Sequence, residues 1–523
     1  MHFDVLIRGG LILDGTGRPG YRADIGIVGD RMREIGACDG AHARHEIDAS
    51  GRYVAPGFID AHLHADAVIH EQGPQLALLR QGVTTVVLGQ DGLSFAPATS
   101  AALAWVSRYF AAVNGYRATE PGEPESSSID SGQVLTVAEL LDGYRGTTAV
   151  NTVYLVPHGT VRYSVMRGSP KPPDADQLAA MVRLVEEGID QGAAGISSGL
   201  GYLPGRFATV HELAALCAPA ARLGLPYVTH MRGYGQQAEL GMVEASAIGR
   251  EARVAVHVSH YHGPSGQLVG LVDAARRSGI DITYDTYPYG RGCSILARML
   301  PDWFGGAELD RVLDRLTDRT ARRRFAAESD PAQWRTLTLS HVPAGSYRWA
   351  IGMRISDAAD AAGVDPADLC ADVLVDTALD AGVVIDFSED EESIRELLRH
   401  NAHMGGSDGI YIGEQPHPRG YGTFARLIRR HVIELGDWTW EEAVVHLSAR
   451  PAARFRLHDR GTIAIGQAAD VIVIDPAAIS DHATYIRPFR LATGIDDVVV
   501  AGIPVLHRGH LTGRLPGVPL YPG

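Results

Sequence analysis

The sequence predicts an α/β protein, a (β/α)8 barrel of the TIM type with a small β-sandwich domain formed by both ends of the chain. From residue 58 to about 457, short apolar runs alternate with amphipathic helical stretches, which is typical of parallel strands joined by helices. The eight runs are 58–60, 85–88, 153–156, 195–198, 227–229, 254–259, 282–284 and 404–407. The two ends of the chain instead alternate apolar and polar residues between glycine-rich turns, which indicates short antiparallel strands.

The chain divides accordingly into two expected domains. We expect the barrel to occupy 57–457 and the β-sandwich domain to combine 1–56 with 458–523. More than a hundred residues separate the last two apolar runs, which is too many for one crossover helix. The segment 291–349 is therefore predicted to be an insertion that covers the site as a lid. The polar stretch 120–133 is predicted to be a loop.

Composition excludes several classes of protein. The 47 basic and 62 acidic residues give a net charge of −15, which argues against a nucleic-acid partner. No apolar run approaches the roughly 20 residues that span a bilayer, and the N-terminus does not resemble a signal peptide. The four cysteines lack the spacing of a disulfide framework, which indicates reduced thiols in a cytoplasmic protein. We expect a small-molecule substrate, and the sequence leaves the oligomeric state open.

Two histidines follow the first barrel strand, in the stretch PGFIDAHLHAD. Residues two apart on a strand point to the same side, so His62 and His64 can reach one metal ion together. Asp91 follows the second strand and could reach the same point. Imidazole suits zinc and similar metals, and a carboxylate adds a hard anionic ligand. The alternative is a pair of ordinary core or surface histidines after a turn.

Polar residues also end most of the other predicted strands. They include His158, His230, His260, Tyr287 and Asp408. In barrels of this type the chemistry lies at the carboxyl ends of the strands. A single histidine at a strand end is commonly structural, but several histidines and two aspartates at neighbouring ends favour a metal site.

A serine-hydrolase motif competes with this interpretation. The stretch GISSG at 195–199 fits the G-x-S-x-G pattern, which requires a sharp turn directly into a helix. The following GLGYLPG is a loop with a proline, so a barrel strand of small residues is the better interpretation. Serine–lysine chemistry also lacks a candidate, because Lys171 is the single lysine of the chain.

At this level of detail the chain resembles the N-acyl-D-amino-acid deacylase (D-aminoacylase) family of the amidohydrolase superfamily. The motifs that carry the resemblance cover nearly the whole length. They are PGFIDAHLHAD, GVTTVVLGQDGLS, HGTVRYSVMRG, GAAGISSGLGYLPG, VTHMRG, VSHYH, DITYDTYPY, GGSDG, HPRGYGTF and DRGTIAIGQAADVIVIDP. The resemblance implies a metal-bearing barrel with a composite β-sandwich domain.

The resemblance also implies roles for individual residues. His230 and His260 match the two histidines that hold the family's tightly bound zinc. His62 and His64 match the pair that holds a weaker second metal, and Asp408 matches the aspartate that acts as general base and can ligate metal. Such a metal lowers the pKa of a bound water to about 7, and the resulting hydroxide attacks the amide carbonyl. Asp408 would take the proton and return it to the leaving nitrogen.

Asp91 departs from the family pattern. It stands where the family usually has a cysteine that binds or bridges zinc. A carboxylate can bridge two cations, and the scarcity of lysine excludes a carboxylated lysine in that role. We therefore expect one or two divalent metals, with zinc preferred less strongly and Mn, Co or Fe more competitive than with a thiolate.

Two further departures concern the substrate. His158 and Tyr287 are candidates for orienting the carbonyl or the substrate, and a structural role on its loop is an equal alternative for His158. The family usually has a lysine where this chain has His262, and a serine where it has Cys293; both contact the substrate's α-carboxylate. Arg291 could substitute, because a guanidinium binds a carboxylate through two parallel bonds. These changes predict weak activity on ordinary N-acetyl-D-amino acids.

The sequence thus predicts a metal-dependent hydrolase of a C–N amide bond in a small N-acylated amine or (D-)amino acid. Two alternatives stay open. The same metal site could catalyse a dehydrative cyclisation or lactone hydrolysis, or the protein could be a scaffold that has lost its chemistry. The retained histidines and Asp408 argue against a scaffold.

Overall fold

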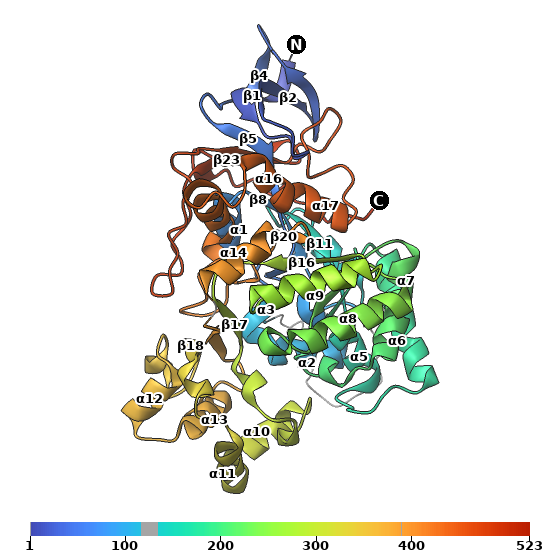
Figure 1. Cartoon of the computed structure of the whole chain (residues 1–523), viewed down its shortest axis with the longest axis vertical. Coiled ribbons are helices and arrows are strands. Elements are labelled where there is room, and N and C mark those ends of the chain that lie inside the picture. The colour runs from blue at the N-terminus through green and yellow to red at the C-terminus, as the bar shows by residue number, and fades with distance from the viewer. Residues whose placement is uncertain (1, 117–133, 389) are drawn as a thin grey trace.

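The structure is a computed structural model of the chain, and it describes residues 2–116, 134–388 and 390–523. The predicted loop at 120–133 lies outside the described residues. The molecule is elongated in Figure 1, with the N-terminal strands at one end, the barrel in the middle and a helical insertion at the other end. None of the described helices is long and apolar enough to cross a bilayer.

Eight parallel strands form the barrel, and each contains part of one predicted apolar run. They are β6 (Phe58–Asp60), β8 (Val83–Leu88), β11 (Asn151–Tyr154), β13 (Ile196–Gly199), β14 (Tyr227–His230), β15 (Val256–Val258), β16 (Ile282–Thr286) and β20 (His403–Gly405). Neighbours in the chain pair with each other, and β12 (Val156–Pro157), which continues β11, pairs with β13. The ring closes where β7 (Leu63–His64) pairs with β21 (Gly409–Ile410). The predicted fold class is confirmed.

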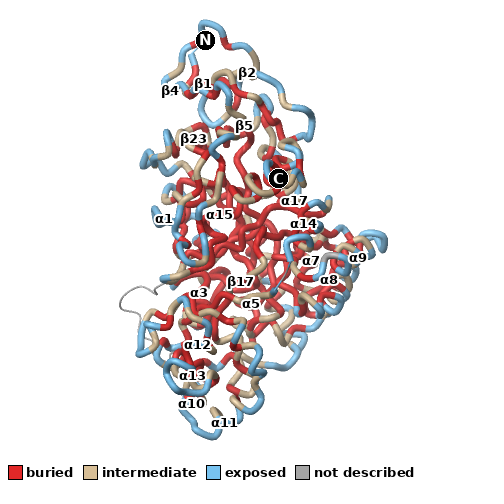
Figure 2. Tube along the Cα trace, turned by 60° about the vertical axis from the view of Figure 1, so that its left-hand side comes forward, coloured by how far each residue is buried: buried red, intermediate tan, exposed pale blue. Residues whose placement is uncertain are grey.

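Helices cover the outside of this ring (Figure 1). They are α1 (Gln72–Arg80), α2 (Ser100–Tyr109), α3 (Ala111–Asn114), α4 (Val137–Tyr144), α5 (His158–Met166), α6 (Ala175–Asp190), α7 (Val210–Arg222), α8 (Ala238–Ala252), α9 (Ser265–Arg277), α14 (Glu391–Arg399), α15 (Arg419–Arg426), α16 (Trp440–Val444) and α17 (Arg450–Arg454). The start of α6 is a capping box, in which Asp174 and Gln177 each accept the other's backbone N–H. Met181, Val185 and Ile189 then recur at a spacing of four and form the buried face of α6. Figure 2 shows the buried residues concentrated in the barrel.

Both ends of the chain contribute strands to one continuous sheet. Its strands are β1 (His2–Ile12), β2 (Tyr21–Val28), β3 (Arg31–Gly36), β4 (His42–Asp48), β5 (Tyr53–Pro56), β22 (Val471–Ile474), β23 (Ile495–Val500), β24 (Ile503–His507) and β25 (His510–Leu511). The two ends meet where β5 pairs antiparallel with β22. Only Gly57 separates β5 from the first barrel strand. We therefore propose the domain division at 56/57 and 457/458 on the strength of this sheet.

The insertion between β16 and β20 is longer than the predicted 291–349. It contains β17 (Arg291–Ile295), β18 (Leu337–His341), β19 (Gly382–Asp386), α10 (Leu309–Thr317), α11 (Arg319–Glu328), α12 (Ile355–Ala362) and α13 (Pro366–Asp376). The strand order is β17–β19–β18, so β19 lies between the other two and the insertion cannot end before it. Phe325 packs edge-on against Phe304 and Trp334, which gives the insertion an aromatic core of its own. A two-stranded ribbon of β9 (Ala98–Thr99) and β10 (Val134–Leu135) completes the described strands.

Candidate metal centre

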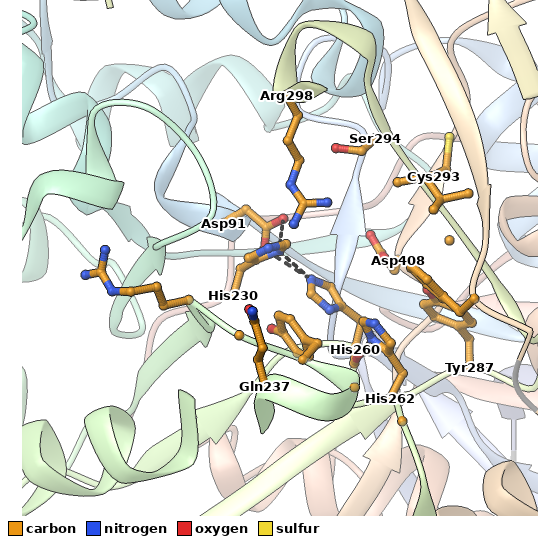
Figure 3. A pocket seen from close by; sticks show the side chains of 18 of the residues that line it. Asp91, His230, Gln237, His260, His262, Tyr287, Cys293, Ser294, Arg298 and Asp408 are labelled. Atoms are coloured by element: carbon orange, nitrogen blue, oxygen red, sulfur yellow. Dashed lines mark hydrogen bonds and ion pairs between the residues drawn. The ribbon is translucent and has the colours of Figure 1, made fainter. Parts of the chain in front are cut away.

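A cavity of about 500 Å³ opens at the carboxyl ends of the barrel strands (Figure 3). The barrel contributes His64, Asp91, His230, His260 and Asp408 to its lining. The insertion forms the facing wall, with β17 and the turn after it. The volume is within the range that small-molecule sites have. The cavity therefore lies where the sequence placed the chemistry.

One group of potential ligands consists of His62, His64 and Asp91. The two Nε2 atoms are 3.2 Å apart, and each is 3.7 Å from an oxygen of Asp91. All three side chains are buried, and Asp91 Oδ1 has no hydrogen-bond partner among the described residues. Two imidazole nitrogens and a carboxylate oxygen that converge in this way can hold one divalent ion.

The second group shares the same carboxylate. His230 Nδ1 and His260 Nε2 lie 2.9 Å apart, and they are 3.3 Å and 3.7 Å from the two oxygens of Asp91. These atoms also lie close enough together to hold an ion. Asp91 thus stands between both histidine pairs, which is the arrangement required of a bridging ligand. Its role as a bridge remains our proposal.

Buried polar groups behind the histidines fix their ring orientations. Asp285 lies 3.5 Å from His62 Nδ1, 3.0 Å from His257 Nε2, and accepts the backbone N–H of His260 at 2.8 Å. The Asn114 side-chain oxygen lies 2.9 Å from His64 Nδ1. Histidines that bind metals commonly use the other ring nitrogen in this way. The second ring nitrogens of His62 and His64 therefore point away from the proposed ion.

Asp60 positions two of the strand ends that carry the site. Its carboxylate accepts the backbone N–H groups of His62, at 3.2 Å, and Ser407, at 2.8 Å. Burial raises the pKa of Asp60 to about 7, although these hydrogen bonds oppose the shift. His62 is one of these two donors and Asp408 directly follows the other, so Asp60 helps to hold both at the mouth of the barrel.

Three of the candidate residues have a left-handed backbone. The φ angles are 56° at Asp91, 34° at His260 and 48° at Asp408. Such angles are uncommon outside glycine, and they cluster at functional sites where the surrounding structure enforces them. Gly92 lets the chain pass β13 after Asp91, since a Cβ there would lie 2.8–2.9 Å from backbone atoms of Ser198 and Gly199.

The electrostatics of the cluster suit a cation. Burial opposes protonation of His64, but Asp408 and Asp91 raise the pKa of His64 to about 10. Burial likewise opposes ionisation of Asp91, yet the neighbouring histidines hold its pKa well below the usual value. Burial lowers the pKa of His230 to about 4, which leaves that ring neutral. The carboxylates thus favour positive charge at this point, and a divalent metal would supply that charge in place of the proton on His64.

Asp408 has a partner that the sequence analysis missed. Arg419 Nη1 lies 2.9 Å from Asp408 Oδ2, and Oδ1 faces His64 Nε2 at 3.3 Å. Burial opposes ionisation of Asp408, but the charge of Arg419 and the nearby histidines lower its pKa. The guanidinium is fully buried and packs on the ring of Tyr287 at 4.8 Å. The HPRGYGTF motif contained this arginine, but no local pattern linked it to Asp408.

Three of the five predicted substrate residues line the cavity; they are Tyr287, Cys293 and His262. His262 is stacked between Tyr234 and Phe387, at ring separations of 4.7 Å and 4.3 Å. Burial lowers its pKa to about 3, so it cannot supply the charge of the lysine that the family has there. Burial raises the pKa of the Cys293 thiol.

The other two predicted substrate residues do not line the cavity. Arg291 is ion-paired with Asp386 at 3.0 Å and packs on the ring of Tyr485, because β17 turns its side chain towards β19. His158 is fully buried, and its Nε2 lies 3.0 Å from Glu212, which also binds Arg162. His158 therefore belongs to a structural ion-pair network rather than to the cavity wall.

The serine motif has a structural explanation. Ser197 donates to the carbonyl of Gly89, and Ser198 bonds with the hydroxyls of Tyr227 and Thr229. Both serines are buried within β13.

The sequence analysis missed two further residues that line the cavity. They are Tyr202, whose hydroxyl lies 2.8 Å from Ser294 Oγ, and Arg298.

Comparison with known proteins agrees with this geometry. Residues 45–506 match the profile described as Amidohydrolase family. D-aminoacylase of Alcaligenes xylosoxydans xylosoxydans is 34% identical over 525 residues, covering 98% of this chain and 97% of that protein. N-acyl-D-glutamate deacylase of the same organism is 34% identical over 530 residues, covering 98% and 96%. The crystal structure of N-acyl-D-glutamate deacylase from Bordetella bronchiseptica, complexed with zinc and a phosphonate mimic of the tetrahedral intermediate, has a TM-score of 0.81. It is 31% identical, and each chain is covered completely.

The barrel and its cluster of histidines and aspartates define a metal-dependent hydrolase. More particularly, the chain belongs to the amidohydrolase family, in its D-aminoacylase branch. It is an enzyme that acts on carbon–nitrogen bonds other than peptide bonds, as the sequence predicted.

Proposed function

We propose that the enzyme removes the acyl group from N-acylated D-amino acids, with a divalent metal of the zinc type. The observation that carries this proposal is the convergence of two histidine pairs on Asp91 beside the Asp408–Arg419 pair. The D-aminoacylase and N-acyl-D-glutamate deacylase relatives support the substrate class.

His230, His260 and Asp91 would hold one metal ion, and His62, His64 and the same Asp91 a second. The 2.9 Å and 3.2 Å gaps between imidazole nitrogens support this assignment, because these atoms converge without intervening protein. When bound, the metal supplies a Lewis acid that polarises the amide carbonyl and makes water acidic near neutral pH. With a carboxylate in place of a thiolate, Mn, Co or Fe should compete with zinc more readily.

Asp408 would move the proton. It is held ionised beside Arg419, and its Oδ1 faces the histidine pair at 3.3–3.6 Å. A carboxylate at this point can accept the proton of the attacking water and donate it to the departing amine nitrogen. Arg419 is a positioning residue, since its ion pair fixes the Asp408 carboxylate.

Tyr202 is placed to assist the carbonyl. Its hydroxyl bonds with Ser294, and its ring lies 4.8 Å from that of His230. Burial raises the pKa of Tyr202, so it remains a neutral hydrogen-bond donor. A neutral donor in a sheltered site stabilises the negative charge that develops on a carbonyl oxygen.

The corner formed by Tyr287, Cys293 and Asp408 would receive the α-carboxylate. Arg419 lies behind this corner, and its guanidinium nitrogens make no further hydrogen bond among the described residues. Its charge, which is shared with Asp408, would offset part of the cost of burying a carboxylate. The sequence analysis gave this role to Arg291. The structure thus favours retained activity on N-acyl-D-amino acids over the weak activity expected from sequence.

We propose that the enzyme is cytoplasmic. The four cysteines, all free in the structure, support this location. The cavity is the size of a small-molecule site, and the net charge of −15 disfavours nucleic acid as a partner.

The test is a kinetic comparison on purified, zinc-loaded protein. N-acetyl-D-methionine, its L enantiomer and its neutral D-methioninamide analogue would be compared by kcat/KM. We expect the D acid to exceed the D amide by at least about tenfold, because the corner at Tyr287 and Cys293 would bind the carboxylate. The D acid should also exceed the L acid by at least about tenfold, as the names of the D-specific relatives suggest. The proposal would be overturned if the enzyme hydrolysed a lactone or if it hydrolysed none of these amides. Equal rates for the acid and its neutral analogue would also overturn it.

A further inference from the structure

His417 is a buried histidine that the proposed mechanism does not use. It is the first residue of the HPRGYGTF motif and lies against the rings of Tyr287 and Tyr289, at 6.1 Å and 5.2 Å between centroids. It does not line the cavity. Arg419, two residues later, forms the ion pair with Asp408. Any effect of His417 on the reaction would therefore pass through a neighbour.

The hydrogen bonds of His417 fix which of its nitrogens carries the proton. The backbone N–H of Arg419 donates to Nδ1 at 3.0 Å. Burial and the charge of Arg419 hold the pKa of His417 well below its usual value, so the ring is neutral. A neutral imidazole has one acceptor and one donor, so Nε2 carries the proton. Nε2 lies 3.1 Å from the Tyr485 hydroxyl, and the backbone of Arg291 is a second hydrogen-bond partner of the ring.

The bond from His417 fixes the start of the helix that carries Arg419. α15 begins at Arg419, and Pro418 before it provides no capping side chain. The first N–H groups of a helix have no acceptor within the helix, so a nearby side chain must supply one. The guanidinium nitrogens of Arg419 make no hydrogen bond among the described residues beyond the ion pair with Asp408. The position of this guanidinium therefore depends on where its backbone is held.

Tyr485 ties His417 to a distant part of the chain. It lies between β22 and β23, in the sheet that both ends of the chain form. The guanidinium of Arg291 packs on its ring at 4.6 Å, and its backbone carbonyl accepts a hydrogen bond from the Gln415 side chain at 2.7 Å. Its ring meets that of His417 edge-on at 4.9 Å. Arg291, which does not line the cavity, thus helps to hold Tyr485 in place.

We propose that His417 is a positioning residue for the Asp408–Arg419 pair, and that Tyr485 ties it to the sheet formed by the chain ends. The steps of this chain are 3.1 Å from Tyr485 to His417, 3.0 Å from His417 to Arg419 and 2.9 Å from Arg419 to Asp408. The inference rests on the proposed function, in which Asp408 moves the proton. His417 and Tyr485 touch neither the metal ligands nor the substrate, so they should affect the rate and leave the metal content unchanged.

Two substitutions of His417 separate its two hydrogen bonds. H417N can place an acceptor where Nδ1 lies, whereas H417Q can place a donor where Nε2 lies but leaves the Arg419 N–H without an acceptor. The measurement is the single-turnover rate on zinc-loaded protein with saturating N-acetyl-D-methionine. We expect a loss of about tenfold or more in H417Q, as for a misplaced catalytic group, and of at most about threefold in H417N. Both should keep the zinc content of wild type. Equal losses, or a larger loss in H417N, would overturn the inference.

The double variant D408N/H417Q tests whether His417 acts through Asp408. Once the base is removed, its position no longer matters, so H417Q should cause no further loss in the D408N background. A further loss as large as in wild type would assign His417 a merely structural role and overturn the inference. If D408N lowers the rate but H417Q does not, the inference is wrong while the proposed function stands. If D408N reacts as fast as wild type, or wild type hydrolyses no N-acyl-D-amino acid, the proposed function fails and the inference fails with it.

The variant Y485F tests the link to the sheet, with Y21F as the matched control. Tyr21 is an exposed tyrosine of β2. Removing the Tyr485 hydroxyl should lower the rate by about two- to fivefold, the value of one hydrogen bond, because the Arg291 backbone still holds the ring. Y21F should behave as wild type. A wild-type rate in Y485F would overturn the role of Tyr485. Y485F removes a single oxygen atom, so this comparison, alone and in the D408N background, decides the inference even if the His417 variants do not fold.

Discussion

The barrel and the insertion meet at one cavity but present their side chains in different ways. The barrel places His230, Asp91 and Asp408 at the ends of hydrogen-bonded parallel strands, with buried partners such as Asp285 behind them. The insertion supplies Cys293 and Arg298 from an antiparallel strand and a 3-10 turn. The difference teaches that the proposed chemistry would rest on paired parallel strand ends, and part of the cavity wall that would face the substrate on an antiparallel strand and a turn.

The largest effect should come from the barrel ligands. His260→Ala removes one nitrogen of the His230–His260–Asp91 group, so activity should fall by about 10³-fold or more, since the metal supplies several kcal/mol of transition-state stabilisation. Metal content by mass spectrometry should fall with it. His211→Ala is the matched control, because His211 is an exposed histidine on α7. Full metal content in the double variant His230→Ala/His260→Ala would refute the assignment.

The second-largest loss of activity should come from changing the proposed general base, Asp408. Asp408→Asn keeps the size of the side chain but removes the base, and such losses lower the rate by about 10²–10⁴-fold. Single-turnover kinetics on zinc-loaded protein would measure it, with metal content as the control. A rate within a few-fold of wild type would exclude Asp408 as the base.

A change in the insertion should be smaller and selective. Cys293→Ser replaces a weak donor by a stronger one at the proposed α-carboxylate corner. We expect kcat/KM for an N-acetyl-D-amino acid to rise by about two- to tenfold, the value of one hydrogen bond. The neutral amide analogue should not change. An equal change on acid and amide would show that Cys293 does not distinguish them.

The smallest expected effect is on the stability of the contact between the insertion and the barrel. His341 of β18 lies 3.1 Å from Glu414, in the loop after β21, and 3.4 Å from Asp380. Burial opposes its protonation, but Asp380 and Glu414 raise its pKa above 6.5. A raised histidine pKa stabilises the contact fully below about pH 6.5, and this stabilisation is lost as the pH rises through the raised value.

Hydrogen exchange at the Gln415 amide, which donates to the Ser340 carbonyl at 3.0 Å, would report on that contact. Wild type should be better protected than His341→Gln at pH 6, and the two should be alike at pH 9 after correction for intrinsic exchange. A difference that is equal at both pH values would show that the charge of His341 does not matter.

The same comparison explains what could be predicted from sequence. The apolar runs of the barrel identified all eight strands, because a buried parallel strand is apolar on both faces. The predicted metal ligands lie together at the predicted end of the barrel; they are His62, His64, Asp91, His230, His260 and Asp408. Each of these residues lies in the last position of a strand or shortly after a strand, so its position could be predicted from local pattern.

Residues that depend on distant contacts were harder to predict. Arg291 alternates away from the cavity because of its register with Asp386 across β19, which the sequence of β17 alone does not reveal. Arg419 lies on α15 and meets Asp408 only through tertiary packing. His158 directly follows β12, as the pattern predicted, but it begins α5 and contacts Glu212 of α7 instead of lining the cavity.

The central claim is that one carboxylate, Asp91, joins the two histidine pairs into a single metal centre. The most direct measurement is zinc per chain, by mass spectrometry after equilibration at defined free zinc, for wild type, Asp91→Ala and Asp91→Cys. We predict that Asp91→Ala loses affinity at both groups, and that Asp91→Cys recovers zinc binding with a stronger preference for zinc over Mn. Asp91→Ala with wild-type zinc content and affinity would contradict the claim.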